Sequence, residues 1–93
     1  MSHLEFPSAL AVFLPDSGGV MFPASFEGRR IRCTVSTGAL ATMAGPGPRP
    51  LGEAHALRTF SVHRRMLQTL ASEIFVTRGA ESDAVEIMED DLG

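Results

Sequence analysis

The stretch from Val20 to Val35 most constrains the fold, because it holds two runs of alternating hydrophobicity around one turn dipeptide, Glu27-Gly28. Such alternation is typical of half-buried β-strands, and a short loop containing glycine joins two of them into a hairpin. A two-residue turn there gives these pairs: Phe26 with Arg29, Ala24 with Ile31, Phe22 with Cys33, and Val20 with Val35. Both apolar faces then lie on the same side of the ribbon, whereas a shift of one residue places them on opposite sides. We therefore expect a central β-hairpin over residues 19–36.

The rest of the chain supplies elements that cover the apolar face of this hairpin. Ser36 is a candidate N-cap for a short helix over residues 37–44, and one long helix is expected over residues 51–78. The long segment has an apolar stripe with helical spacing, made of Leu57, Phe60, Leu67, Ala71 and Ile74. Residues 84–88 alternate again and predict a C-terminal strand. The pattern predicts an α+β fold, with a small antiparallel sheet built on the hairpin and packed on the long helix.

The first 19 residues are open to more than one interpretation. Residues 4–6 predict a short strand, and residues 8–14 form either an edge strand or a loop that packs Val12 and Leu14 on the core. Pro23 lies within the first strand of the hairpin and has no N–H to donate to a neighbour. We therefore expect the strand that contains it to lie at or near an edge of the sheet.

The composition is that of a small globular protein. A chain of 93 residues, 44% hydrophobic and 20% charged, is expected to form one domain over residues 1–93. Its longest apolar run covers residues 9–14 and is far too short to span a membrane. The run lacks the basic start and the cleavage site of a signal peptide. The single cysteine, Cys33, excludes an internal disulfide and a zinc site built from cysteines, so a cytoplasmic location is expected.

The charges are unevenly placed along the chain. Residues 1–80 hold all eight arginines and five acidic residues, whereas residues 81–93 hold six acidic residues and no basic one. Arg29, Arg30 and Arg32 lie at and after the hairpin turn and are candidates for contacting phosphate groups. The net charge of −3 and the absence of Tyr and Trp argue against nucleic-acid binding. A weak nucleic-acid or anion binder is therefore the alternative hypothesis rather than the leading one.

His63 and Arg64 are the candidate polar site on the long helix. His63 would act as a general base or an anion contact with Arg64 beside it. However, a general base needs a positioned partner, and no carboxylate lies nearby in the sequence. The alternative is that His63 hydrogen-bonds a strand or loop carbonyl at the edge of the core, while the stem of Arg64 covers apolar surface. No catalytic residue is therefore expected.

The other reactive or metal-binding side chains have simpler interpretations. Cys33 falls on the inward face of the hairpin and is expected to be a small buried hydrophobe rather than a nucleophile. His3, His55 and His63 match no spacing of metal ligands. Residues 89–91 are acidic but lack the spacing of a calcium loop, so a solvated acidic terminus is expected. We expect neither a metal nor a cofactor.

Two sets of residues carry a resemblance to a known family. They are Val20-x-Phe22-x-Ala24, Gly28 and Ile31-x-Cys33-x-Val35 in the hairpin, and Phe60-x-x-His63-Arg64 in the helix. With these residues, the chain resembles the bacterial domain-of-unknown-function 1488 family from about residue 4 to residue 92. The resemblance implies a small fold with an antiparallel sheet on a long helix, and it implies no activity and no catalytic residues. The chain departs from the family pattern at Asp91-Leu92, where an Asp-Phe pair is common, and at residues 73–75, where a basic residue is usual.

Surplus apolar residues favour an interaction module over an enzyme. Val62, Met66 and Val76 lie on the side of the long helix opposite its apolar stripe, and Met21 and Pro23 lie on the outward face of the sheet. Val62 and Met66 are the candidate partner contacts. The leading interpretation is a small non-enzymatic interaction or accessory module that contacts an unknown protein or a second copy of itself. Because proline and outward arginines oppose edge-to-edge pairing, a helix-mediated homodimer is favoured over extension of the sheet.

Overall fold

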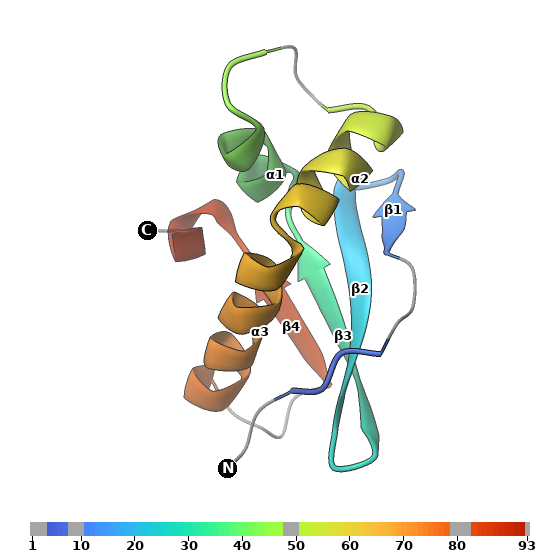
Figure 1. Ribbon diagram of the computed structural model, residues 1–93, viewed down its shortest axis with the longest axis vertical. Helices are drawn as coiled ribbons and strands as arrows, with labels where there is room; N and C mark the ends of the chain where they lie inside the picture. Colours follow the sequence, from blue (N-terminus) through green and yellow to red (C-terminus); the bar gives the residue numbers. More distant parts are fainter. Residues whose placement is uncertain (1–3, 8–10, 48–50, 79–82, 93) are drawn as a thin grey trace.

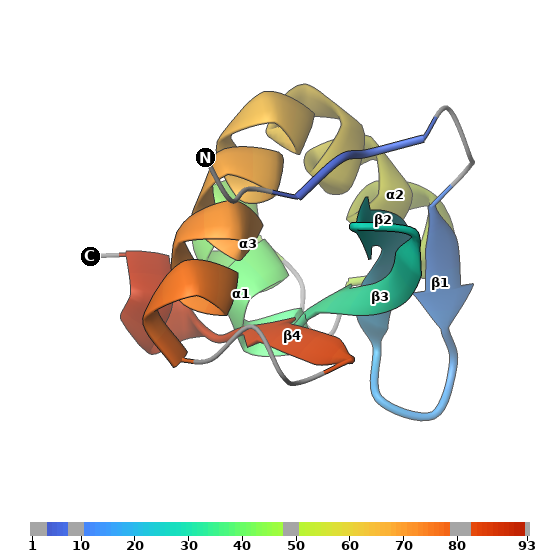
Figure 2. The same ribbon diagram turned by 90° about the horizontal axis from the view of Figure 1, so that it is seen from below.

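A computed structural model describes residues 4–7, 11–47, 51–78 and 83–92 of the chain. The elements in these ranges are β1 (Val12–Leu14), β2 (Gly19–Phe26), β3 (Arg29–Val35), α1 (Thr37–Ala44), α2 (Glu53–Val62), α3 (Arg64–Arg78), β4 (Ala84–Ile87) and the 3-10 helix η1 (Glu89–Leu92). The strands form one sheet in the order β1-β2-β3-β4, and the helices lie together on one side of it (Figures 1 and 2). The α+β fold expected from the sequence is confirmed. Among the described residues, no helix combines the length and apolar character needed to cross a bilayer.

The hairpin of β2 and β3 has the register that the sequence predicts. Val20 pairs with Val35, Phe22 with Cys33, and Phe26 with Arg29. The two turn residues both have left-handed backbone, with φ of 50° at Glu27 and 80° at Gly28. This is the type I′ geometry, whose twist matches that of the flanking strands. The turn therefore sets the register, and the register places Val20, Phe22, Cys33 and Val35 together in the core.

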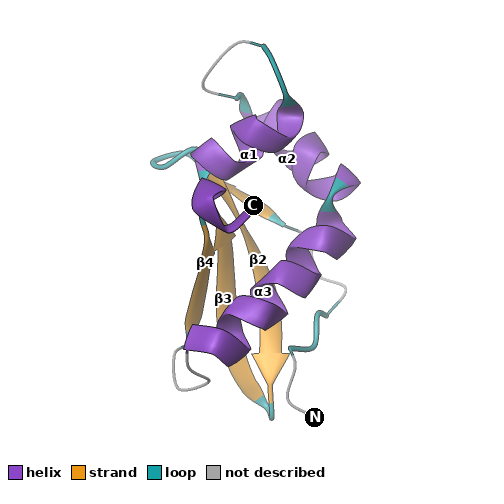
Figure 3. Ribbon diagram, turned by 90° about the vertical axis from the view of Figure 1, so that its left-hand side faces the viewer, coloured by secondary structure: helices purple, strands orange, loops and turns teal. Residues whose placement is uncertain are grey.

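The sheet is mixed rather than antiparallel, because β4 runs parallel to β3. Arg32 pairs with Ala84 and Val35 with Ile87. A parallel neighbour needs a long crossover connection, and here the three helices between β3 and β4 provide it (Figure 3). Glu86 consequently lies beside Thr34.

The long helix expected over residues 51–78 is divided in two at His63. The backbone N–H of His63 is shared between the carbonyls of Thr59 (3.2 Å) and Phe60 (3.1 Å), and its φ and ψ of −105° and 15° depart from helical values. A histidine ring and a hydroxyl also compete for the helix backbone there: His63 Nδ1 bonds the Thr59 carbonyl at 3.0 Å, and Thr59 Oγ1 donates to the His55 carbonyl at 2.9 Å. Such side-chain bonds to the backbone bend or interrupt helices. The chain nevertheless keeps its apolar stripe across the break.

The core lies between the sheet and the helices. Its fully buried large side chains come from both layers and include Ile31, Leu40, Phe60, Leu67, Phe75 and Ile87. A row of rings crosses the interface, with centroids 6.1 Å apart between Phe6 and Phe22 and 5.0 Å apart between Phe22 and Phe60. Ser36 caps α1 as expected, since its Oγ accepts the N–H of Ala39 at 3.0 Å. The core is thus assembled from side chains of both layers.

The N-terminal part of the chain adds an incomplete edge to β2. Glu5 forms an isolated bridge with Ser25, and β1 pairs with β2 only as far as Met21. Pro23 lies in the interval between these two contacts, so its missing N–H interrupts no ladder. Of the two alternatives for residues 8–14, the edge strand is observed at Val12–Leu14. The loop alternative, with Val12 packed on the core, is not: Val12 is exposed, and Phe13 packs on the core instead. The prediction for residues 8–10 lies outside the described residues.

Candidate functional site

The three arginines at the hairpin do not act as one cluster. Arg29 Nε lies 3.2 Å from the carboxylate of Asp83, and its guanidinium lies 6.0 Å from the centre of the Phe26 ring. Arg29 is therefore held at the edge where β3 meets the start of β4. Arg30 and Arg32 are exposed, and Arg32 is on the same face of the sheet as Pro23, its cross-strand neighbour. Of these three arginines, Arg30 and Arg32 therefore lie on the face that the helices leave uncovered.

The uncovered face of the sheet contains a shallow hollow of about 650 Å³. Its walls come from β2, β3 and the N-terminal segment, with Pro7, Met21, Pro23, Arg30 and Arg32 among the lining residues. The hollow lies where the outer edge of β2 has no strand beside it, between the end of β1 and the bridge at Ser25. None of the described residues that line it is acidic. We refer to this region as the sheet hollow.

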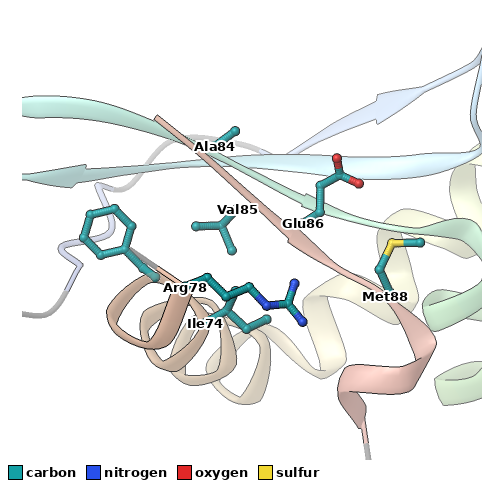
Figure 4. A pocket seen from close by; sticks show the side chains of 7 residues that line it. Ile74, Arg78, Ala84, Val85, Glu86 and Met88 are labelled. Atoms are coloured by element: carbon teal, nitrogen blue, oxygen red, sulfur yellow. The ribbon is translucent and has the colours of Figure 1, made fainter. Parts of the chain in front are cut away.

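A second groove lies on the helix side, between α3 and the edge strand β4 (Figure 4). It has a volume of about 500 Å³ and an apolar floor of Ile74, Phe75 and Val85. Arg78 lies along it and donates to Asp91 Oδ1 at 3.1 Å, while Glu86 points away from α3. The lining contains one basic residue, Arg78, and one acidic residue, Glu86, and Arg78 is already paired with Asp91. This groove therefore has no clear preference for a charged ligand.

His63 makes a hydrogen bond to a carbonyl and Arg64 covers apolar surface, as the non-catalytic alternative predicted, but the carbonyl differs from the expected one. His63 bonds a carbonyl of its own helix rather than one of a strand or loop. The guanidinium of Arg64 lies 5.2 Å from the centre of the Phe60 ring, so its stem and head cover the aromatic core. The carboxylate of Glu86, on β4, is exposed and points away from α3, so it does not supply a partner for His63. His63 and Glu86 are therefore not brought together.

The remaining reactive side chains have structural environments. Cys33 is fully buried, and burial raises the pKa of its thiol from 9.0 to about 12, which keeps it protonated. In the acidic terminus, Asp91 accepts the N–H of Met88 at 2.9 Å, and Glu89 accepts the hydroxyl of Thr42 at 3.3 Å. The described residues contain no group of three side chains suited to hold a metal ion. His3 lies outside the described residues.

The outer face of α2 and α3 carries the candidate partner contacts. Val62 is 73% exposed, Met66 45% and Val76 56%. Arg65, Thr69 and Glu73 lie between them and are also exposed. Met66 borders a shallow hollow of about 480 Å³ that α3 forms with η1. Arg65 and Glu73 were not singled out from the sequence, although their spacing of eight residues on the polar side of the helix was visible there. We call these six residues the outer helix stripe.

Comparison with known proteins identifies the family of the chain. A family model described as "Protein of unknown function (DUF1488)" matches residues 4–87. The chain belongs to the DUF1488 family. The match covers β1 to β4, and thus includes the hairpin and the Phe60-x-x-His63-Arg64 segment of this DUF1488 chain. Comparisons with curated proteins and with solved structures give no match.

Proposed function

We propose that this chain is a non-enzymatic interaction module that forms a homodimer through the outer helix stripe. The observation that supports this most is the exposure of three large apolar residues on one side of α2 and α3, away from the core. Exposed apolar residues that gather on one face, bordered by polar ones, are typical of protein-binding surfaces. The environments of Cys33 and His63 support the non-enzymatic part. A single buried cysteine also suits the reducing cytoplasm, which we include in the proposal.

The charges of the stripe favour a second copy as the partner. Arg65 and Glu73 lie four residues before and four residues after Thr69, and Val62 and Val76 lie seven residues before and after it. In an antiparallel pair related by a two-fold axis at Thr69, Arg65 of each copy lies at the height of Glu73 of the other. Val76 of each copy then lies near the start of the other copy's α3, next to the end of α2, where Val62 is exposed. A two-fold interface must be complementary to itself, and this stripe satisfies that condition in both charge and apolar content.

The size of the stripe limits the strength of the dimer. The 15 residues of α3 span about 22 Å at 1.5 Å per residue. A single helix pair of this length buries less than the roughly 1,200 Å² of a standard stable interface. Exposed ion pairs add only about 0.2–1 kcal/mol each. We therefore expect a reversible dimer with a Kd of order 10 μM, weakened by salt.

Charge reversal tests the proposal by sedimentation equilibrium over 1–300 μM chain. Arg65→Glu and Glu73→Arg should each dimerise several-fold more weakly than the wild type, because every copy then brings like charges together. An equimolar mixture of the two variants should dimerise, since each then supplies the charges that the other lacks. The double variant Arg65→Glu/Glu73→Arg should recover the homodimer.

The matched control is Arg30→Glu/Arg32→Glu, which changes charge on the sheet face and should leave the dimer intact. A wild-type chain that stays monomeric at 300 μM would refute the proposal. So would single variants that dimerise as well as the wild type.

A further inference from the structure

We propose that the sheet hollow binds an extended, acidic segment of a partner protein. The first observation concerns the ion pairing of Arg30 and Arg32, the two arginines at its rim. Within the part of the chain that the structure describes, the ion pairs engage Arg29 and Arg78, and neither Arg30 nor Arg32 has a carboxylate within ion-pair distance. Two guanidinium groups on one face, with no acidic residue lining the hollow beside them, are complementary to carboxylates.

The spacing of the arginines specifies an extended segment. Arg30 and Arg32 are two residues apart on β3, so they point to the same side of the sheet and their Cα atoms are about 7 Å apart. Two acidic residues at positions i and i+2 of an extended peptide have the same separation. A peptide lying along β3 therefore places one carboxylate over each arginine.

The apolar part of the hollow defines a third position of the segment. Met21 pairs with Thr34, and Pro23 pairs with Arg32. Both therefore lie on the same face of the sheet as the two arginines, and they continue the hollow toward β1. Both are half-buried, and their side chains offer an apolar contact without a hydrogen-bonding group. Position i+4 of the peptide would lie next to Met21. The motif that fits is acidic-x-acidic-x-apolar.

A protein segment fits this surface better than a nucleic acid does. Non-specific affinity for nucleic acids grows with the number of phosphates neutralised, and two arginines can neutralise only two. No aromatic side chain among the described residues lines the hollow, so bases have nothing to stack on. The net charge of −3 further opposes a polyanion, whereas a short peptide with two carboxylates experiences this repulsion less.

Fluorescence anisotropy with a labelled peptide tests the proposal. The probe is fluorescein-Ser-Glu-Ser-Glu-Ser-Leu-Ser, and a matched peptide with Gln at both Glu positions measures the contribution of charge. We expect saturable binding of the Glu peptide that is at least tenfold weaker for the Gln peptide. The Arg30→Glu/Arg32→Glu variant should bind the Glu peptide at least tenfold more weakly than the wild type does. If that variant does not fold by circular dichroism, Arg30→Gln/Arg32→Gln replaces it.

The Arg65→Glu variant, altered only in the outer helix stripe, should bind the peptide as the wild type does. Failure of the dimer and failure of the sheet hollow are therefore distinguishable. Equal binding of the Glu peptide to the wild type and to the double arginine variant would overturn the proposal, as would no saturable binding. A 20-nucleotide oligothymidine that binds through Arg30 and Arg32 more tightly than the peptide would also overturn it, in favour of a nucleic-acid site.

Discussion

Replacing Gly19 by alanine should disrupt the sheet at the start of β2. A Cβ atom at this buried position would lie 2.5 Å from the carbonyl oxygen of Val35, nearly 1 Å closer than ordinary van der Waals contact. The obstacle is the backbone of β3, which is held by β2 on one side and by β4 on the other, so it cannot move aside cheaply. Overpacking of this kind costs about 1–3 kcal/mol, and a backbone obstacle places Gly19→Ala near the upper end. Since 1 kcal/mol corresponds to about 4–8 °C in a domain of this size, Tm should fall by about 12–24 °C.

Gly28→Ala is the matched control in the same hairpin. Gly28 has a φ of 80°, but a Cβ there would have no atom within 4 Å. Its replacement therefore costs only the left-handed backbone penalty, about 1–2 kcal/mol. Both variants and the wild type are compared by urea unfolding, followed by circular dichroism at 222 nm. If Gly19→Ala proves no less stable than Gly28→Ala, the argument from close backbone approach is refuted.

Two further predictions concern Cys33 and Arg64. Because burial raises the pKa of Cys33 from 9.0 to about 12, the unfolded chain ionises first, and the free energy of unfolding should fall by about 1.4 kcal/mol per pH unit above pH 9. Urea unfolding at pH 8–10.5 should show this fall in the wild type and not in Cys33→Ala; parallel curves for the two would contradict it. Arg64→Ala should destabilise the fold by about 0.5–1 kcal/mol through loss of the contact with Phe60, and Arg64→Met, which keeps an apolar cover, by less. Equal stability of all three chains in the same assay would show that the contact contributes nothing.

The hairpin could be predicted residue by residue, because turn length and alternation are two local signals that agree. The apolar stripe could be predicted as well, since Phe60, Leu67 and Ala71 keep their helical spacing. The break at His63 could not, because no proline or glycine marks it. It depends on where the ring of His63 and the hydroxyl of Thr59 find their hydrogen bonds.

The direction of β4 and the composition of the sheet hollow also lay beyond the sequence. Alternation in residues 84–88 indicates which side chains face inward, and this is the same for a parallel and an antiparallel neighbour. The three arginines looked like one patch because they adjoin in the chain. Strand alternation places Arg29 on the other face from Arg30. The ion pair that engages Arg29 comes from Asp83, 54 residues later in the chain. Distant pairings of this kind decide which charges remain available for binding.

The parallel pairing of β3 with β4 has a consequence for how the chain folds. The hairpin contacts are local in sequence, whereas the edge of β3 next to Arg32 and Val35 has no partner until residues 84–87 are available. Closing that edge requires a loop of about 50 residues, which makes it the contact of highest entropic cost in the sheet. During synthesis, a chain that contains the hairpin but not yet β4 therefore presents an unpaired strand edge, which is a template for aggregation. The outward arginines of β3 are placed where they oppose stacking of such intermediates.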